Sequence, residues 1–201
     1  AVTHGAEGVE FDVHLTKDKV PVVMHDEEID RTTDGTGFIK DYTISELRKF
    51  HLANGEPVPM LSELFEVLQN RDIYINLEFK TNKVHDVGIE GIVLALAKKY
   101  HFVHPIIFSS FNYQTLKNCQ RIDLHQQYCF LTKMPVALPE RFVKKNHFAA
   151  IHPHFYLPSK VTQRIWTVDN PRIAKRYFKL GVAGIFTNNF ELMNKVKEKS
   201  R

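Results

Sequence analysis

Acidic and basic side chains stand two residues apart inside two apolar, strand-like runs of this sequence. The first run contains Glu10 and Asp12, and the second contains Glu78 and Lys80. Because residues two apart in an extended strand point to the same face, the members of each pair project together. Burying like charges side by side is costly unless a cation neutralises them. Oxygen ligands suit Mg²⁺ or Ca²⁺, so Glu10, Asp12 and Glu78 are candidate ligands of one such ion.

A histidine follows a third apolar run. His25 and Asp26 come directly after residues 20–24. An imidazole beside a bound cation and a phosphate can donate a proton to a leaving alkoxide, so these groups together have the chemistry of a phosphodiesterase site. Two alternatives stay open. The acidic strand face could be solvated, with its carboxylates paired to lysines, and His25 could be a structural histidine at a strand end.

The composition is that of an ordinary globular protein. Of the 201 residues, 43% are hydrophobic and 25% are charged, as in ordinary soluble domains. A chain of this length can bury a sizeable core. No apolar run approaches the roughly 18 residues of a membrane span, so we expect no stable membrane insertion. The formal net charge of +4 could steer anionic substrates. Because no unbroken basic block of five residues is present, we do not expect nucleic-acid binding.

The cysteines and the first residues bear on the cellular compartment. Cys119 and Cys129 lack CxxC spacing, and we expect free buried thiols rather than a disulfide. Free thiols favour a reducing compartment, and residues 1–4 carry no signal-peptide pattern, so we expect a cytoplasmic protein. The alternating His152 and His154 have no further histidine or cysteine close by in sequence, which disfavours a zinc site.

Strand-like runs alternate with helical patterns along the chain. Apolar residues at helical spacing predict helices within residues 61–68 and 86–100, and helix starts are predicted at Thr43 and at Asn170. This alternation predicts a parallel α/β sheet or barrel. The predicted strands cover residues 9–15, 20–24, 73–79, 105–109, 127–131, 149–152, 164–168 and 182–186.

The alternation is interrupted at two places. Residues 17–19 are too few for a parallel crossover, so residues 9–25 should form a hairpin that brings His25 close to Glu10 and Asp12. Between His152 and Arg164 an expected helix is missing. No repeat, low-complexity segment or linker divides the chain, and we expect a single domain over residues 1–201.

Taken in order, short stretches of the sequence resemble the glycerophosphodiester phosphodiesterase family. The resemblance covers nearly the whole chain, and the ordered set is highly specific although no single piece is. The stretches are GAEGVEFDV at 5–13, LTKD at 15–18, VPVVMHD at 20–26, RTT at 31–33, PMLSE at 59–63, NLEFK at 76–80, FSSF at 108–111, WTVD at 166–169 and GIFTN at 184–188.

The resemblance implies a (β/α)8 TIM barrel whose site lies at the carboxyl ends of the strands. It implies that Glu10, Asp12 and Glu78 hold one divalent cation, Mg²⁺ or Ca²⁺. Lys80 would neutralise phosphate charge, and His25 would act as general acid or base.

The resemblance also implies a substrate and a reaction. Phe111 and Trp166 would wall the pocket around the glycerol or alcohol moiety, and Arg31 would form a structural ion pair. A glycerol hydroxyl would attack the neighbouring phosphorus, pass through a cyclic phosphate and release the alcohol. The substrates would be small glycerophosphodiesters such as glycerophosphocholine or glycerophosphoethanolamine, and the products would be an alcohol and sn-glycerol 3-phosphate.

The sequence departs from the family pattern in three places. Family members begin with a strand that ends in His-Arg-Gly, and here Thr3-His4-Gly5 falls instead at the end of a predicted helix before residue 9. A helix after Ser159 is missing, and Asn188 stands where the family usually has Asp. The expected fold is therefore a (β/α)8 TIM barrel that lacks its first strand and one later helix.

Two rival functions follow from these departures. A non-catalytic barrel that binds a metal or a phosphodiester is favoured by the absent His-Arg-Gly, whereas the intact acidic set with Lys80 and His25 disfavours it. A related phospholipase would need an apolar lip facing the membrane, and the sequence shows no clear exposed aromatic cluster for one.

Overall fold

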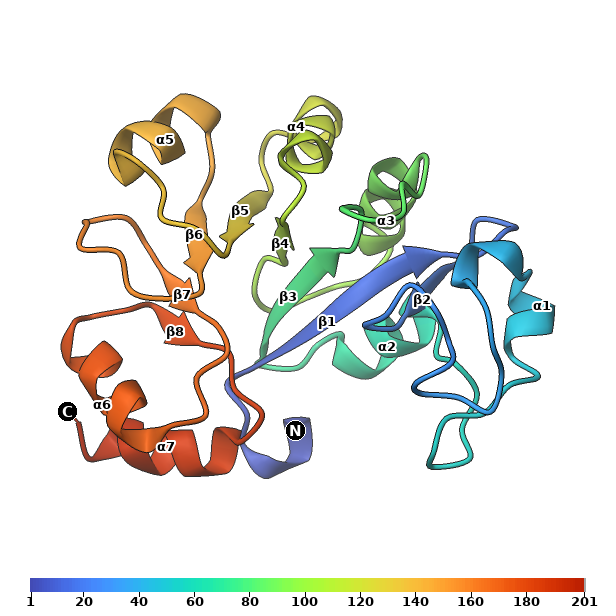
Figure 1. Cartoon of the computed structure of the whole chain (residues 1–201), viewed down its shortest axis with the longest axis horizontal. Helices are drawn as coiled ribbons and strands as arrows, with labels where there is room; N and C mark the ends of the chain where they lie inside the picture. The colour runs from blue at the N-terminus through green and yellow to red at the C-terminus, as the bar shows by residue number, and fades with distance from the viewer. Residues whose placement is uncertain (201) are drawn as a thin grey trace.

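The computed structural model describes residues 1–200, in which eight strands are interspersed with helices (Figure 1). The strands are β1 (Gly8–Leu15), β2 (Pro21–Val23), β3 (Tyr74–Phe79), β4 (Ile107–Ser110), β5 (Gln127–Thr132), β6 (Ala150–Pro153), β7 (Arg164–Ile165) and β8 (Gly184–Ile185). The α-helices are α1 (Ile44–Leu47), α2 (Leu61–Leu68), α3 (Ile89–Ala97), α4 (Tyr113–Ile122), α5 (Pro139–Asn146), α6 (Pro171–Lys179) and α7 (Phe190–Glu198), and two 3-10 turns cover Val2–His4 and Ile39–Asp41.

The strands form a parallel barrel that is not closed. Six strands pair in the order β2-β1-β3-β4-β5-β6, and β7 pairs with β8. Every pairing is parallel except that of β1 with β2. A parallel bridge between Ile151 and Gln163 connects β6 to the residue before β7. Within residues 1–200, seven parallel strands therefore stand where a (β/α)8 barrel has eight, and the opening lies between β8 and β1.

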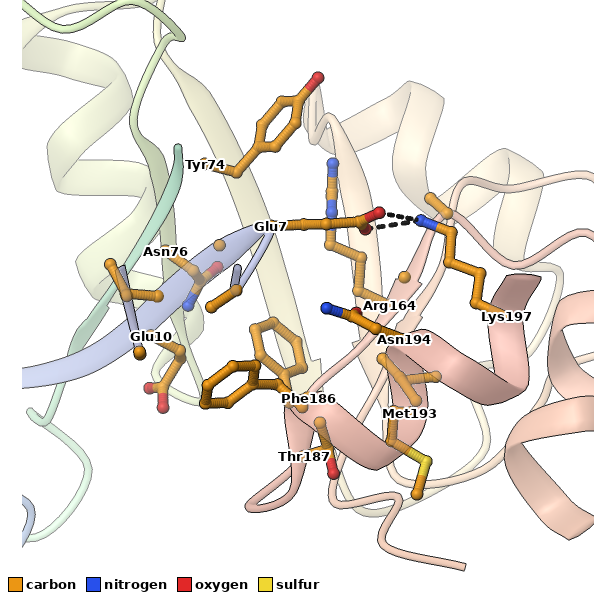
Figure 2. A pocket seen from close by; sticks show the side chains of 18 of the residues that line it. Glu7, Glu10, Tyr74, Asn76, Arg164, Phe186, Thr187, Met193, Asn194 and Lys197 are labelled. Atoms are coloured by element: carbon orange, nitrogen blue, oxygen red, sulfur yellow. Dashed lines mark hydrogen bonds and ion pairs between the residues drawn. The ribbon is translucent and has the colours of Figure 1, made fainter. Parts of the chain in front are cut away.

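A groove of about 450 Å³ occupies this opening, and Figure 2 shows the side chains that line it. Its walls include Gly8 and Glu10 of β1 and Gly184 of β8. At the amino end of β1, Lys197 of α7 pairs with Glu7, with Nζ 2.7 Å from Oε1 (Figure 2). Within residues 1–200 no strand precedes β1, in line with the expectation from the sequence, and this groove is where a further strand would pair.

The first two strands form the predicted hairpin. Val13 pairs with Val23 and Leu15 with Pro21, in antiparallel register. Asp18 stabilises the turn, because its Oδ1 accepts a hydrogen bond of 2.6 Å from the Thr16 hydroxyl and another of 2.9 Å from the Ile44 amide. The hairpin therefore directs the residues after β2 back along β1 toward Asp12, whose carbonyl accepts a hydrogen bond from the Met24 amide at 3.1 Å.

Most predicted helix boundaries are confirmed. Thr43 and Glu46 form a reciprocal capping box, and the Asn170 side chain accepts the amide of Arg172 at 2.9 Å. The helix predicted over residues 86–100 is shorter, because Gly88 adopts a left-handed backbone (φ 87°) and the helix begins only at Ile89. The last two strands are also shorter than the predicted 164–168 and 182–186, although backbone hydrogen bonds from Ala183 to Gln163 and from Val168 to Phe186 join the two segments beyond the strand residues.

The core lies between the sheet and the helices that cover its outer face. Phe65 of α2, Phe79 of β3 and Phe108 of β4 are among its fully buried members. Both cysteines are buried free thiols, as predicted. None of the helices within residues 1–200 combines the length and the hydropathy needed to cross a membrane.

The connection from β6 to β7 contains no helix, which confirms the interruption predicted there. Residues 154–163 form an irregular segment instead. The buried side chain of Gln163 satisfies polar backbone groups of this segment. It accepts a hydrogen bond from the Leu157 amide and donates one to the Leu157 carbonyl, each at 2.8 Å.

Candidate active site

Strand register brings the acidic side chains together. In the parallel pairing of β1 with β3, Asp12 lies opposite Glu78, and Glu10 lies opposite Asn76. Side chains alternate between the two faces of a strand, so these four residues share the interior face of the barrel. Lys80 follows β3 in the same alternation and reaches the same place.

The carboxylates are close enough to share one cation. One oxygen from each of Glu10, Asp12 and Glu78 lies within 4.8 Å of the others. Lys80 Nζ lies 3.0 Å from Asp12 Oδ1 and 3.1 Å from Glu78 Oε1. Asp12 and Glu78 are buried, whereas Glu10 is exposed on the side that faces the groove between β1 and β8.

The electrostatics of this cluster show an excess of negative charge. Although Glu10 is open to the groove, the barrel atoms around its carboxyl group displace water, and this desolvation, followed by the charges of Asp12 and Glu78, raises the pKa of Glu10 to about 8. Burial and the charge of Asp12 raise the pKa of Glu78 to about 7. Burial alone would lower the pKa of Lys80, but the two carboxylates beside it outweigh burial and raise it. One lysine therefore does not neutralise three carboxyl groups.

The donor set fits a hard divalent cation. Asp12 Oδ1 and Glu78 Oε1 are buried and make no hydrogen bond, even though both lie within ion-pair distance of Lys80 Nζ. Their lone pairs therefore remain available to a second positive charge. Three carboxylate oxygens with no nitrogen or sulfur ligand are the donor chemistry of Mg²⁺ or Ca²⁺ rather than of zinc. Glu10, Asp12 and Glu78 could thus hold such an ion.

A second cavity, of about 640 Å³, opens over this cluster. It contains every side chain that the sequence singled out for the site, and its wall also includes side chains that the sequence reasoning missed. The predicted members are Glu10, Asp12, His25, Glu78, Lys80, Phe111 and Trp166; the additional ones include Glu27, Asn76, Asn82, Lys83 and Lys133. Among these, Asn76 had a readable signal, because it precedes Glu78 and Lys80 at the same two-residue spacing.

His25 is held at the rim of this cavity by an acidic partner. Its Nδ1 lies 2.6 Å from Asp26 Oδ1, and Arg31 Nε donates to the other oxygen of the same carboxylate. The hydrogen bonds from Arg31 and His25 lower the pKa of Asp26 to about 2. The His25 side chain is 65% exposed, so its second ring nitrogen can exchange protons with a bound ligand or with water. Arg31 forms the ion pair that the sequence comparison implied.

Two aromatic side chains form an apolar wall. The Phe111 and Trp166 rings meet edge to face with centroids 5.3 Å apart. Trp166 is fixed by a hydrogen bond of 2.7 Å from Nε1 to the His152 carbonyl. The pocket thus offers an acidic floor that could hold an ion, a lysine and an aromatic wall, and this arrangement suits a small molecule with one charged end.

His152 and His154, the alternating histidines of the sequence, do not form a zinc site. His152 is fully buried and its Nε2 faces Arg164 Nη1 at 3.4 Å, whereas His154 is exposed and packs against Trp166. Asn188 has its own partner, since its backbone and side-chain nitrogens each donate to Asp169 at 2.8 Å.

The fold and the cavity together define a parallel (β/α)-barrel protein with an acidic pocket, which could hold a cation, at the carboxyl ends of its strands. A model of the glycerophosphoryl diester phosphodiesterase family matches residues 1–192. The chain is 34% identical over 216 residues to a glycerophosphodiester phosphodiesterase of Caldanaerobacter subterraneus subsp. tengcongensis, covering 98% of this chain and 89% of that protein. It is 29% identical to one of Bacillus altitudinis, covering 100% of this chain and 90% of the relative.

Solved structures agree with this similarity. The glycerophosphodiester phosphodiesterase of Thermotoga maritima superposes with a TM-score of 0.77 at 29% identity, covering 97% of this chain and 87% of that one. A phosphodiesterase of Oleispira antarctica, solved with the product sn-glycerol-3-phosphate, gives a TM-score of 0.88 at 22% identity, covering 98% and 87%. At that identity the second likeness concerns the fold alone. The chain belongs to the glycerophosphodiester phosphodiesterase family, and it is a phosphodiester hydrolase.

Proposed function

We propose that this protein is a metal-dependent phosphodiesterase that cleaves small glycerophosphodiesters, such as glycerophosphocholine or glycerophosphoethanolamine, to an alcohol and sn-glycerol 3-phosphate. One observation carries the proposal. Three carboxylates of β1 and β3 converge within 4.8 Å in a pocket that also contains Lys80 and His25. A divalent cation held by Glu10, Asp12 and Glu78 would polarise a phosphoryl oxygen.

The remaining roles fall to side chains of the chain itself. The ammonium group of Lys80 neutralises charge that develops on the phosphoryl oxygens. His25, oriented through Nδ1 by Asp26, transfers a proton to or from the reacting oxygens at Nε2. A hydroxyl of the glycerol attacks the adjacent phosphorus, the alcohol leaves, and water then opens the resulting cyclic phosphate. Phe111 and Trp166 hold the glycerol or alcohol moiety and limit the access of water.

Two further features belong to the same proposal. Residues 1–201 act as a single domain, because the pocket draws side chains from β1 through the residues after β8. Two buried free thiols agree with a reducing compartment, and we propose the cytoplasm.

The proposal is tested by release of glycerol 3-phosphate from glycerophosphocholine and glycerophosphoethanolamine. We expect release by the purified protein, loss of release with EDTA and recovery on adding Mg²⁺ or Ca²⁺. Activity that resists chelation would disprove metal dependence. Comparing the two ions and the two head groups identifies the native combination.

A non-catalytic barrel is the second candidate. It is favoured by the exposure of Glu10 to the groove between β1 and β8, which leaves one of the three carboxylates open on that side. Calorimetric binding of Mg²⁺ or Ca²⁺ with no release of glycerol 3-phosphate from either substrate would favour this candidate over hydrolysis.

A further inference from the structure

Two loops at the carboxyl ends of the strands expose apolar side chains. Residues 133–138 connect β5 to α5, and residues 154–163 connect β6 to β7. Met134 is 72% exposed, Leu138 is 66% exposed and Phe155 is 37% exposed. We refer to Met134, Leu138 and Phe155 as the apolar lip.

The two loops that carry the lip are neighbours. Thr132 pairs with Pro153 at the ends of β5 and β6, and the His154 amide donates to the Thr132 carbonyl at 3.0 Å. Further out, the Lys160 amide donates to Glu140 Oε1 at 2.9 Å, which ties the second loop to the first turn of α5. The lip is therefore one feature built from two adjoining loops.

The lip is continuous with the pocket. Leu131 and Lys133, just before Met134, line the cavity over the acidic cluster. A series of rings leads from the pocket wall to the lip. The centroid of Trp166 is 4.8 Å from that of His154, which lies 6.4 Å from that of Phe155.

Positive charge is concentrated in the same part of the chain. Between residues 124 and 168 there are six basic residues and one carboxylate, Glu140, which gives this segment a charge of +5. Because the whole chain carries +4, the remaining residues sum to −1. Lys133, Arg141 and Lys160 belong to the two lip loops or to the first turn of α5, whereas Lys144 and Lys145 lie in its last turn and Arg164 faces His152 at the start of β7.

Single exposed apolar residues are common and need no explanation. Here several lie together beside a pocket, in a basic segment of the chain, and that combination needs an explanation. Apolar side chains can enter the boundary between head groups and acyl chains, while lysines and arginines attract anionic lipids. We propose that the apolar lip docks on the surface of a bilayer that contains anionic phospholipid, so that the pocket opens toward the membrane. This docking is peripheral and goes beyond the proposed hydrolysis, on which it does not depend.

Co-sedimentation with vesicles tests the docking without measuring catalysis. The full chain should bind vesicles of equal parts phosphatidylcholine and phosphatidylglycerol, and binding should fall when salt is raised from about 0.1 M to about 1 M. Replacing Met134, Leu138 and Phe155 together by Ser should lower the partition coefficient at least about tenfold. The matched control is Val103→Ser with Leu124→Ser, exposed residues in segments that precede β4 and β5, which should bind like the wild type.

A second pair of variants tests the charge and holds even if the Ser variants fold poorly. Arg141→Glu with Lys160→Glu reverses two charges near the lip. Lys144→Glu with Lys145→Glu makes the same net change at the far end of α5. Each charge reversal near the lip should weaken binding to the anionic vesicles at least about fivefold. The control pair should weaken vesicle binding much less.

Three outcomes would overturn the docking. These are no binding of the wild type to anionic vesicles, equal binding to phosphatidylcholine alone, and binding unchanged by both sets of lip variants. If the lip instead drives self-association on gel filtration without vesicle binding, the partner is a second copy and the lipid assignment is wrong. Failure to cleave both glycerophosphocholine and glycerophosphoethanolamine would count against the proposed function and would leave the sedimentation result untouched.

Discussion

Asp12 and Glu78 are direct partners in the parallel register of β1 with β3, and both carboxyl groups are buried. Lys80 Nζ lies 3.0 Å from the first and 3.1 Å from the second, so a single ammonium group stands against two acids. An arrangement with surplus negative charge is unfavourable in the protein alone and becomes favourable once a divalent cation binds. We therefore expect the stability of the fold and the binding of such an ion to be coupled at this pair.

The first prediction concerns Lys80. In EDTA, Lys80→Met should lower the free energy of unfolding by about 3 kcal/mol, because it leaves buried carboxylates without a positive partner. Saturating Mg²⁺ or Ca²⁺ should restore most of the loss, and Lys80→Arg should lose less than Lys80→Met. The measurement is urea denaturation with and without the ion. Equal stability of Lys80→Met and wild type in EDTA would show that the lysine does not compensate the acids.

The second prediction concerns Glu78. Glu78→Gln keeps the shape of the side chain but removes one anionic ligand, so turnover of glycerophosphocholine should fall at least about 100-fold. The rise in melting temperature caused by Mg²⁺ or Ca²⁺ should shrink at the same time. Glu66→Gln, an exposed carboxylate of α2, is the matched control and should behave like the wild type. Near-normal turnover in Glu78→Gln would place the site elsewhere.

Much of this architecture follows from local sequence patterns. The two-residue spacing of Glu10 with Asp12 and of Glu78 with Lys80 predicts which side chains share a face, and β1 and β3 confirm it. The short link at residues 17–19 predicts the hairpin correctly. Such features depend on a few neighbouring residues, which is why they can be read from one sequence.

Features that depend on residues distant in sequence could not be predicted. Met134 and Leu138 share the apolar lip with Phe155 because the pairing of β5 with β6 makes their loops neighbours. No local spacing in the sequence reveals that the two loops adjoin. The same holds for Lys133, which follows β5; β4 separates this strand from β3, and Lys133 lines the pocket only because the sheet curves into a barrel.

The third prediction concerns His25. His25→Ala should lower turnover by about 10²- to 10⁴-fold, as expected for the loss of a general acid or base. Because the side chain is 65% exposed, the free energy of unfolding should change by no more than about 0.5 kcal/mol. Steady-state kinetics with thermal unfolding measures both. A large loss of stability, or turnover within a few-fold of wild type, would assign His25 a structural role. His85→Ala, in the segment before α3, is an exposed histidine control.

The fourth prediction concerns His152, a fully buried histidine on β6 beside Arg164. Burial, and then the positive charge of Arg164, lower its pKa well below 6.5. The folded state thus binds this proton less readily than the unfolded state. Its contribution to stability is complete above about pH 6.5 and is lost as the pH falls below that value, at up to about 1.4 kcal/mol per pH unit.

Replacing His152 by Gln isolates this contribution from other titrating groups. Between about pH 7 and pH 5 the unfolding free energy of the wild type should fall relative to that of His152→Gln, because only the wild type must keep an imidazole neutral in its core. His125→Gln, an exposed histidine before β5, should run parallel to the wild type. Denaturant unfolding across this range measures the difference. If the unfolding free energies of wild type and His152→Gln ran parallel with pH, the His152 ring would titrate alike in the folded and unfolded states.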